Sequence, residues 1–168
     1  MDISSLPELE KLYLESFSAE ERTPFDKLMT GKFKNFTMLA VYKQDTMIDL
    51  IHANNTDDFL YINYFAVKKE LQDRGYGSQI LTKLKQEYDK PIVLDVEEID
   101  EKTTDNETKR RRKNFYLKNG FQHGKYSLFW IGNHMTYMYY GNIDEHKYLE
   151  YLKKTFVNIT NIQKRDED

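Results

Sequence analysis

Cysteine is absent from this chain of 168 residues, and proline and glycine are scarce, with three and seven residues. The absence of cysteine excludes disulfides, thiolate metal sites and a cysteine nucleophile. No apolar run approaches the roughly 18 to 20 residues that cross a membrane, and the first residues lack the basic and apolar segments of a signal peptide. The four histidines are scattered and make no metal-ligand spacing. We therefore expect a cytoplasmic protein without a metal site or a membrane partner.

The charges that are present nearly balance, because 28 acidic residues face 25 basic ones and leave a net charge of −3. Such a balance gives no overall field that would attract nucleic acid or a membrane surface. Aromatic residues are plentiful, with thirteen tyrosines and ten phenylalanines, and they indicate a core and a cleft built from rings. The length predicts a single domain over residues 1–168 with a sizeable core.

The most informative stretch is a strand, a short loop and a helix between residues 59 and 88. Residues 59–67 are rich in β-branched and aromatic side chains, which predicts a buried strand. The residues that follow the loop 72–78 place apolar side chains on one helical face, namely Ile80, Leu81, Leu84 and Tyr88. The first turn of a helix offers unpaired N–H groups, glycines admit close approach, and Arg74 adds charge. The loop therefore suits a phosphate or pyrophosphate group.

The glycine pattern excludes two common phosphate loops, since it matches neither the dinucleotide fingerprint nor the P-loop. Instead, Gln72-x-x-Gly75-x-Gly77, after a strand that ends Phe65-Ala66-Val67, resembles the acyl-coenzyme A loop of the GNAT superfamily of N-acetyltransferases. The stretch 91–97 resembles the next strand of that family, and residues 114–121 resemble its helix ending Tyr-x-x-x-Gly-Phe. Order and spacing agree with the family from about residue 59 to residue 121.

This resemblance implies an α/β (α+β) fold of GNAT type. Its central sheet would be mixed but mostly antiparallel, with about six to seven strands flanked by helices and a splay between two central parallel strands. It implies direct acetyl transfer from acetyl-coenzyme A to a primary amine of a small molecule or peptide, without metal or covalent intermediate. The residues implied in cofactor binding are Phe65, Ala66, Val67, Gln72, Asp73, Arg74, Gly75, Tyr76, Gly77 and Ser78.

Two residues are predicted to be catalytic. Tyr116 matches the tyrosine with which the family protonates the leaving thiolate, and a phenol with a pKa near ~10 is a proton donor at neutral pH. For the general base we favour Glu97, which follows the predicted strand and shares a strand face with Asp95. Glu21, in a bend near the amino terminus, is the other candidate, and either carboxylate could act through water.

The rest of the chain is predicted from its apolar periodicity and turn residues. An amino-terminal helix carries Leu9, Leu12, Tyr13 and Phe17, and a second helix starts at Thr23 and includes Phe25, Leu28 and Met29. The other expected elements are strands at 36–42, 47–53 and 92–96 (the last parallel to 59–67), a helix ending at Gly120, a hairpin at Gly132-Asn133, a helix capped by Asp144, and a fraying tail at 164–168.

Two alternatives to the enzyme remain open. A GNAT-fold module could bind acyl-coenzyme A as a sensor without turnover. The basic run Lys109–Lys113 could bind nucleic acid, although five consecutive residues of a helix cannot share one face and most of them should be solvated. The rings of Tyr64 and Trp130 could line the acceptor cleft or pack the sheet, and the last hairpin and helix are where a homodimer contact is expected.

Overall fold

A computed structural model describes residues 6–19, 21–99, 106–130, 132–156 and 159–165. The described residues form four α-helices and seven strands, mostly antiparallel, and this confirms the predicted mixed α/β fold. The chain divides into two compact units, residues 1–55 with 61–87, and residues 56–60 with 88–168. The splay between two central strands and the single domain over 1–168 both concern how these units combine, and they stay predictions.

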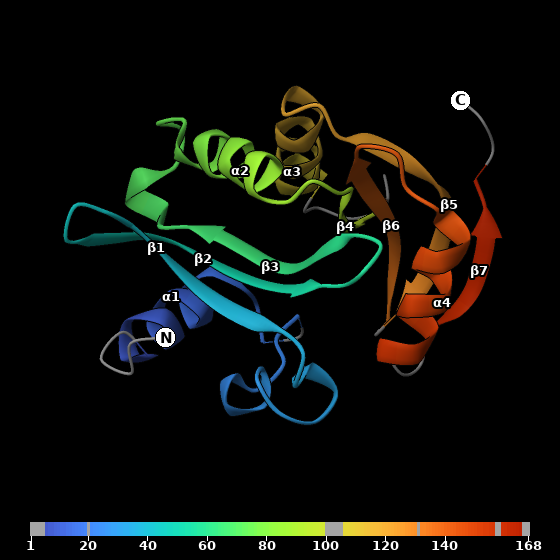
Figure 1. The fold of residues 1–168 in the computed structure, drawn as a ribbon, viewed down its shortest axis with the longest axis horizontal. Helices are drawn as coiled ribbons and strands as arrows, with labels where there is room; N and C mark the ends of the chain where they lie inside the picture. Colours follow the sequence, from blue (N-terminus) through green and yellow to red (C-terminus); the bar gives the residue numbers. More distant parts are fainter. Residues whose placement is uncertain (1–5, 20, 100–105, 131, 157–158, 166–168) are drawn as a thin grey trace. The chain divides into compact units, whose positions relative to one another are not determined.

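The first unit contains a three-stranded arrangement in the order β1-β2-β3, with a helix on each face (Figure 1). Its elements are α1 (Leu6–Ser16), β1 (Thr37–Lys43), β2 (Thr46–Asn55), β3 (Leu60–Val67) and α2 (Tyr76–Glu87). The predicted hairpin is confirmed, since β1 and β2 pair antiparallel and Lys43 lies opposite Thr46. The predicted central strand and the helix after its loop are also present.

The core of the first unit lies under α1. Leu9, Leu12 and Tyr13 are buried against a cluster that includes Met47, Leu50 and Tyr64, as the helical periodicity predicts. Each such aliphatic side chain stabilises the fold by roughly 1.5–3 kcal/mol on burial. The apolar stripe therefore fixes which face of α1 meets the strands.

The second predicted helix is wrong. The segment forms two short 3₁₀ turns, Phe25–Lys27 and Gly31–Phe33, and Met29 lies exposed between them. A tertiary contact competes with the helix, because the carbonyl of Leu28 accepts a hydrogen bond of 2.7 Å from Nε2 of His52. Gly31 then adopts a left-handed φ of +54°, which a continuing α-helix does not allow.

β2 carries two fully buried titratable side chains with contrasting environments. His52 is satisfied on both ring nitrogens, since Asn63 lies 3.1 Å from Nδ1 and the Leu28 carbonyl takes the Nε2 proton. Burial lowers the pKa of His52 to about 4, so the ring is neutral. Asp49 has no hydrogen-bond partner among the described residues, and burial raises the pKa of its carboxyl group to about 9. Asp49 is therefore protonated at neutral pH.

The second unit contains four antiparallel strands in the order β4-β6-β5-β7. Its elements are β4 (Ile92–Glu97), α3 (Asn106–Lys118), β5 (Gln122–Trp130), β6 (Asn133–Tyr140), α4 (Glu145–Thr155) and β7 (Thr160–Lys164). The predicted cap of α4 is confirmed, because the Asp144 carboxylate accepts hydrogen bonds from two backbone N–H groups of its first turn. No helix in the described parts of the chain is long and apolar enough to cross a bilayer.

The strand β7 corrects the predicted fraying tail at residues 164 and 165, and the rest of that prediction, 166–168, lies outside the described residues. Lys164 ends this strand and lies opposite Tyr126 of β5, and the N–H of Arg165 donates to the carbonyl of Lys125 at 2.7 Å. The strand is polar and largely exposed. Because an edge strand is held by backbone pairing, its sequence needs no apolar alternation, and the period-2 signal was missing.

Tyrosines build much of the core of the second unit. Tyr137 and Tyr148 are fully buried, and their ring centroids lie 4.4 Å apart. The hydroxyl of Tyr137 donates to Glu145 at 2.6 Å, and that of Tyr148 hydrogen-bonds Asp95. Gly124 makes room for the Tyr137 ring, since a Cβ atom there would lie 2.1 Å from ring carbons. Tyr137 therefore packs the sheet.

Candidate functional site

The loop after β3 is shaped by local hydrogen bonds and two left-handed residues. A 3₁₀ turn (Lys69–Leu71) follows the strand, and the side-chain amide of Gln72 donates back to the carbonyl of Val67 at 3.1 Å. Asp73 and Gly75 then adopt φ values of +59° and +80° on either side of Arg74. In the pattern Gln-x-x-Gly, the glutamine thus provides a hydrogen bond to the end of the strand. The glycine adopts a left-handed φ that costs other residues energy.

The reversal delivers the chain into the first turn of α2. The carbonyl of Gly75 accepts the N–H of Gln79 at 3.1 Å, so Gly75 caps the helix. The following N–H groups, up to Ser78, belong to the first turn and have no intrahelical acceptor. Gly77 is buried, whereas the loop from Gln72 to Gly75 is exposed. Together with Arg74, these groups form a solvent-facing anion site at a helix amino terminus.

Sequence reasoning missed a second cation at this loop. Lys43, the last residue of β1, donates from Nζ to the hydroxyl of Tyr76 at 2.9 Å and lies 4.8 Å from its ring centroid. This hydrogen bond lowers the pKa of the Tyr76 phenol. No sequence signal could have found Lys43, since only the β1–β2 hairpin brings it to Tyr76, 33 residues later.

The amino-terminal bend with Glu21 is held by a buried tyrosine of β3. The hydroxyl of Tyr64 donates to the carbonyl of Glu21 at 3.0 Å and accepts the N–H of Thr23 at 3.2 Å. The Glu21 carboxylate itself accepts the N–H of Ser18 at 2.9 Å. Tyr64 is only 9% exposed and packs edge-on against Tyr13. Tyr64 is therefore a core residue that positions the bend. The last three residues of β3, Phe65 to Val67, are alternately half-buried and buried.

In the second unit, Tyr116 belongs to the ending of α3. The N–H of Phe121 donates to the carbonyl of Tyr116 at 3.1 Å, and the N–H of Gly120 donates to that of Leu117 at 2.9 Å. Gly120 has a φ of +77°, and the rings of Tyr116 and Phe121 lie 5.4 Å apart. These are the bonds and the apolar contact of a Schellman motif. The motif Tyr-x-x-x-Gly-Phe therefore has a structural reason of its own, and it fixes the backbone that carries the Tyr116 phenol.

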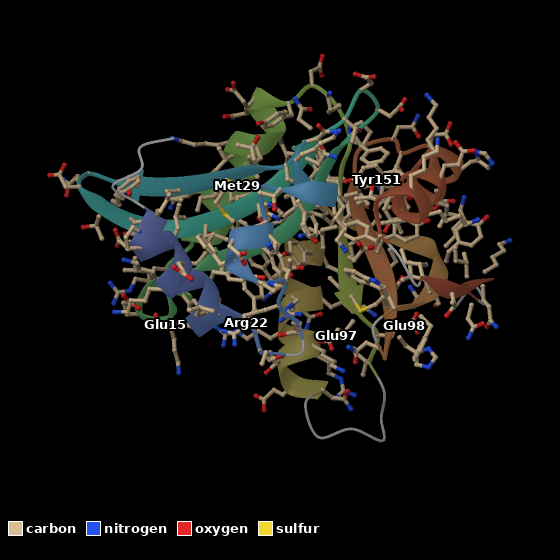
Figure 2. All side chains as sticks on the ribbon, turned by 90° about the horizontal axis from the view of Figure 1, so that it is seen from below. Glu15, Arg22, Met29, Glu97, Glu98 and Tyr151 are labelled. Atoms are coloured by element: carbon tan, nitrogen blue, oxygen red, sulfur yellow. The ribbon has the colours of Figure 1, made fainter. Side chains whose placement is uncertain are left out.

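Glu97 lies at the end of β4 beside α3 (Figure 2). One carboxylate oxygen is 3.7 Å from Nζ of Lys109, and the other is 3.8 Å from Nη1 of Arg112. Its neighbour on the strand face, Asp95, instead bonds Tyr148 of α4. The described residues contain no group of three or more His, Asp or Glu side chains that could hold a metal ion.

The basic run on α3 is less solvated than predicted. Lys109, Arg112 and Lys113 are half-buried, and only Arg110 and Arg111 are exposed. The spacing i, i+3, i+4 puts the three half-buried residues on one helix face, toward Glu97. The same spacing was visible in the sequence and could have separated the two groups.

A pocket of about 200 Å³ opens where β4 ends. Its walls come from four parts of the second unit, and they are Val96, Glu97, Glu98, Ile99, Lys113, Thr136 and Arg165. Glu98 is held by a hydrogen bond from Ser127 and lies 3.6 Å from Nε of Arg165. The sequence analysis considered Glu97 as a base and Lys113 within the basic run, and it missed Arg165, which only the pairing of β7 with β5 brings here.

Comparisons with known proteins agree on one family. The sequence profile of the acetyltransferase (GNAT) domain matches residues 34–123. A Bacillus subtilis protein named as a candidate acetyltransferase, YjbC, is 33% identical over 116 residues, which are 61% of this chain and 56% of that protein. The chain thus spans little more than half the length of this relative.

Solved structures resemble the chain more completely. A candidate acetyltransferase of the GNAT family from Bacteroides thetaiotaomicron has a TM-score of 0.69 at 28% identity, and the match covers 90% of this chain and 88% of that one. A Bacillus subtilis acetyltransferase solved in complex with coenzyme A has a TM-score of 0.56 at 17% identity, over 82% of this chain and 93% of that one. At that identity the second likeness indicates the fold alone.

Proposed function

The chain belongs to the GNAT acetyltransferase family, and we propose that it transfers the acetyl group of acetyl-coenzyme A to a primary amine of a small molecule or peptide. The observation that carries this proposal is the loop from Gln72 to Ser78. Its two left-handed residues and its tie to Val67 present a helix amino terminus and Arg74 to solvent. A pyrophosphate is the ligand that such a backbone site suits. A cytoplasmic location and a homodimer stay proposals.

The proposed cofactor contacts follow from this loop. The N–H groups of Gly75, Tyr76, Gly77 and Ser78 bind the pyrophosphate, and Arg74 and Lys43 add positive charge. Gln72 and Asp73 shape the turn, and the backbone of Phe65, Ala66 and Val67 receives the pantetheine arm. An acetyltransferase of similar fold has been solved with coenzyme A, and this supports the choice of ligand.

The proposed reaction is a direct transfer. The neutral amine nitrogen attacks the thioester carbonyl carbon, the carbon–sulfur bond breaks, and an amide and free coenzyme A form. One proton leaves the amine nitrogen, and one proton reaches the departing sulfur. We assign the second proton to the Tyr116 phenol, whose backbone is fixed by the Schellman motif at the end of α3.

We assign the first proton to Glu97, directly or through water. Its oxygens lie 3.7 and 3.8 Å from two cations, so accepting a proton would weaken those ion pairs. Both distances exceed the roughly 2.7–2.9 Å of a charge-assisted hydrogen bond, so neither cation is hydrogen-bonded to its carboxylate oxygen. Glu21 is the alternative base, and the Ser18 N–H already occupies one of its oxygens.

The cofactor proposal is tested by calorimetric titration of acetyl-coenzyme A into the wild type and a Gly77→Glu variant. A glutamate in the first turn of α2 opposes the phosphates by bulk and by charge, so binding should be lost. Gln86→Glu is the matched control, because it adds the same charge at an exposed position in the last turn of α2. Since Gly77 is buried, circular dichroism must show that the variant folds, and Arg74→Gln provides a milder variant that should weaken binding.

Turnover is tested by thiol release over a panel of amines. Release with any amine establishes the enzyme, and Glu97→Gln against Glu21→Gln then identifies the base by the loss of the acidic limb of the pH–rate profile. Binding without turnover across the panel would favour a sensor of acyl-coenzyme A. No binding in the wild type would overturn both readings.

A further inference from the structure

We propose that the pocket at the end of β4 selects an acceptor that carries an anionic group, a carboxylate or a phosphate, besides its amine. That the acceptor carries an amine rests on the proposed function. That it also carries an anionic group is inferred from the pocket itself. Every wall residue belongs to the second unit. At about 200 Å³ the pocket has room for a group of amino-acid size.

The first argument is the charge of the walls. Two carboxylates, Glu97 and Glu98, and two cations, Lys113 and Arg165, line the pocket. Two more cations, Lys109 and Arg112, lie 3.7 and 3.8 Å from the Glu97 oxygens. The wall residues and these two partners of Glu97 together carry four positive charges and two negative ones, and this excess favours an anionic ligand.

The second argument is which of these charges still lack partners. Both Glu97 oxygens face cations, and Glu98 is engaged by Ser127 and by Nε of Arg165. Lys113 forms no ion pair or hydrogen bond with any residue that the structure describes, although it is half-buried. The carboxylates are thus already paired, whereas an ammonium group is left for a ligand.

The third argument is geometry. The backbone N–H of Arg165 is fixed by the Lys125 carbonyl at 2.7 Å, so its side chain starts from a paired strand end. Its Nε lies 3.6 Å from Glu98, and the guanidinium group carries further N–H donors that suit an oxyanion. Val96 and Ile99 add an apolar wall for the carbon skeleton of the acceptor. We therefore name Lys113 and Arg165 as specificity-determining residues.

The experiment compares acceptors in matched pairs by thiol release. The free L-amino acids are compared with their amides, and O-phosphoethanolamine with ethanolamine, in the wild type, Lys113→Gln and Arg165→Gln. Lys118→Gln is the control, since it removes an equal charge from an exposed position of α3. For at least one pair the wild type should prefer the acid by about tenfold or more in kcat/KM, the range of one charged hydrogen bond. Either pocket variant should remove most of that preference, and the control should keep it.

The cofactor is the other source of an anion, and calorimetry with acetyl-coenzyme A separates the two. The inference expects an unchanged Kd for acetyl-coenzyme A in Lys113→Gln and Arg165→Gln. A raised Kd would assign the anion to a coenzyme A phosphate and overturn the inference. Equal rates for acids and amides, or a preference that survives both variants, would overturn it as well.

A readout without turnover keeps the inference separate from the proposed function. The same acids are titrated into ¹⁵N-labelled protein, and the amide signals of Glu98 and Thr136 are followed. Shifts with acids but not amides, abolished in Lys113→Gln, would support the pocket even if no acetyl transfer occurs. If no acid shifts these signals in the free or the acetyl-coenzyme A-saturated protein, the pocket inference fails, whatever the outcome of the cofactor titration.

Discussion

The loop from Gln72 to Ser78 and the pocket at the end of β4 are two sites built in opposite ways. The loop is made of consecutive residues, and its functional groups are backbone N–H groups set by two left-handed residues. The pocket is made of side chains from β4, α3, β6 and the end of β7, between residues 96 and 165. A backbone site leaves a motif in the sequence, whereas a side-chain site depends on the tertiary structure. The predictions below test whether the two sites respond as differently as their construction implies.

The largest effect is expected for Tyr116→Phe. The ring keeps its contact with Phe121, so the Schellman motif and the stability should be retained, but the proposed proton donor is lost. We expect kcat to fall about 100-fold or more, with an unchanged melting temperature and an unchanged Kd for acetyl-coenzyme A. Tyr140→Phe is the control, since this ring also packs on Phe121. Retained activity in Tyr116→Phe would leave the tyrosine with a structural role only.

The second largest effect is expected on the stability of the Gly124→Ala variant, in the strands that carry part of the pocket wall. The new Cβ atom would lie 2.1 Å from the buried Tyr137 ring, next to Thr136 of the pocket wall. Overpacking of this kind costs about 3 kcal/mol in the free energy of unfolding. Gly132→Ala is the control, because its site is open and only its φ of +79° opposes alanine, which costs about 1 kcal/mol. Chemical denaturation measures both, and equal costs would contradict the packing argument.

A third effect concerns the buried Asp49 of β2, in the same unit as the loop, and depends on pH. Burial raises the pKa of Asp49 to about 9, above its value of about 4 in the unfolded chain, so the folded state binds more protons between these values. Wild-type stability should therefore fall as the pH rises from about 6.5 toward 9, by at most about 1.4 kcal/mol per pH unit. Asp49→Asn should remove this slope in denaturation curves recorded across the range. A slope that persists in the variant would assign it to another group.

His52 should show the opposite dependence. Burial lowers its pKa to about 4, whereas the unfolded value is near 6.5, so the unfolded state binds more protons in this window. In the wild type the Asp49 slope opposes this one between about pH 4 and 6.5. In the Asp49→Asn background, therefore, stability should fall as the pH drops from about 6.5 to about 4, by up to roughly 3 kcal/mol. His52→Gln, which does not titrate, should lose this acid slope at the cost of lower stability at neutral pH.

The smallest effect is expected for Gln72→Ala. Its amide ties the loop to the Val67 carbonyl through one exposed hydrogen bond, worth about 1 kcal/mol. The Kd for acetyl-coenzyme A should rise by about fivefold, measured by calorimetry, with Gln79→Ala on the exposed side of α2 as control. Complete loss of binding would contradict the view that the loop binds mainly through its backbone, since the loop would then depend on a side chain as strongly as the pocket does.

Many elements of the fold could be predicted from sequence patterns that span only a few residues. The stripe at Leu9, Leu12 and Tyr13, the hairpin of β1 and β2, and the Asp144 cap were predicted because each signal is contained within one element. The failures have a common cause. The helix expected near Leu28 was replaced through a hydrogen bond from His52, and β7 is held by pairing with β5. Contacts between distant residues decided both.

The sequence by itself determined the strand, the loop and the helix that follows it, together with the helix ending around Gly120. These depend on φ preferences and hydrogen bonds between residues a few positions apart, so a contiguous motif specifies them. Only the tertiary structure decided that Lys43 reaches Tyr76, that Glu97 meets Lys109 and Arg112, and that Arg165 lines a pocket with Lys113. Long charged side chains carry no periodic signal of their own, and strand pairing and helix orientation alone determine which charges meet.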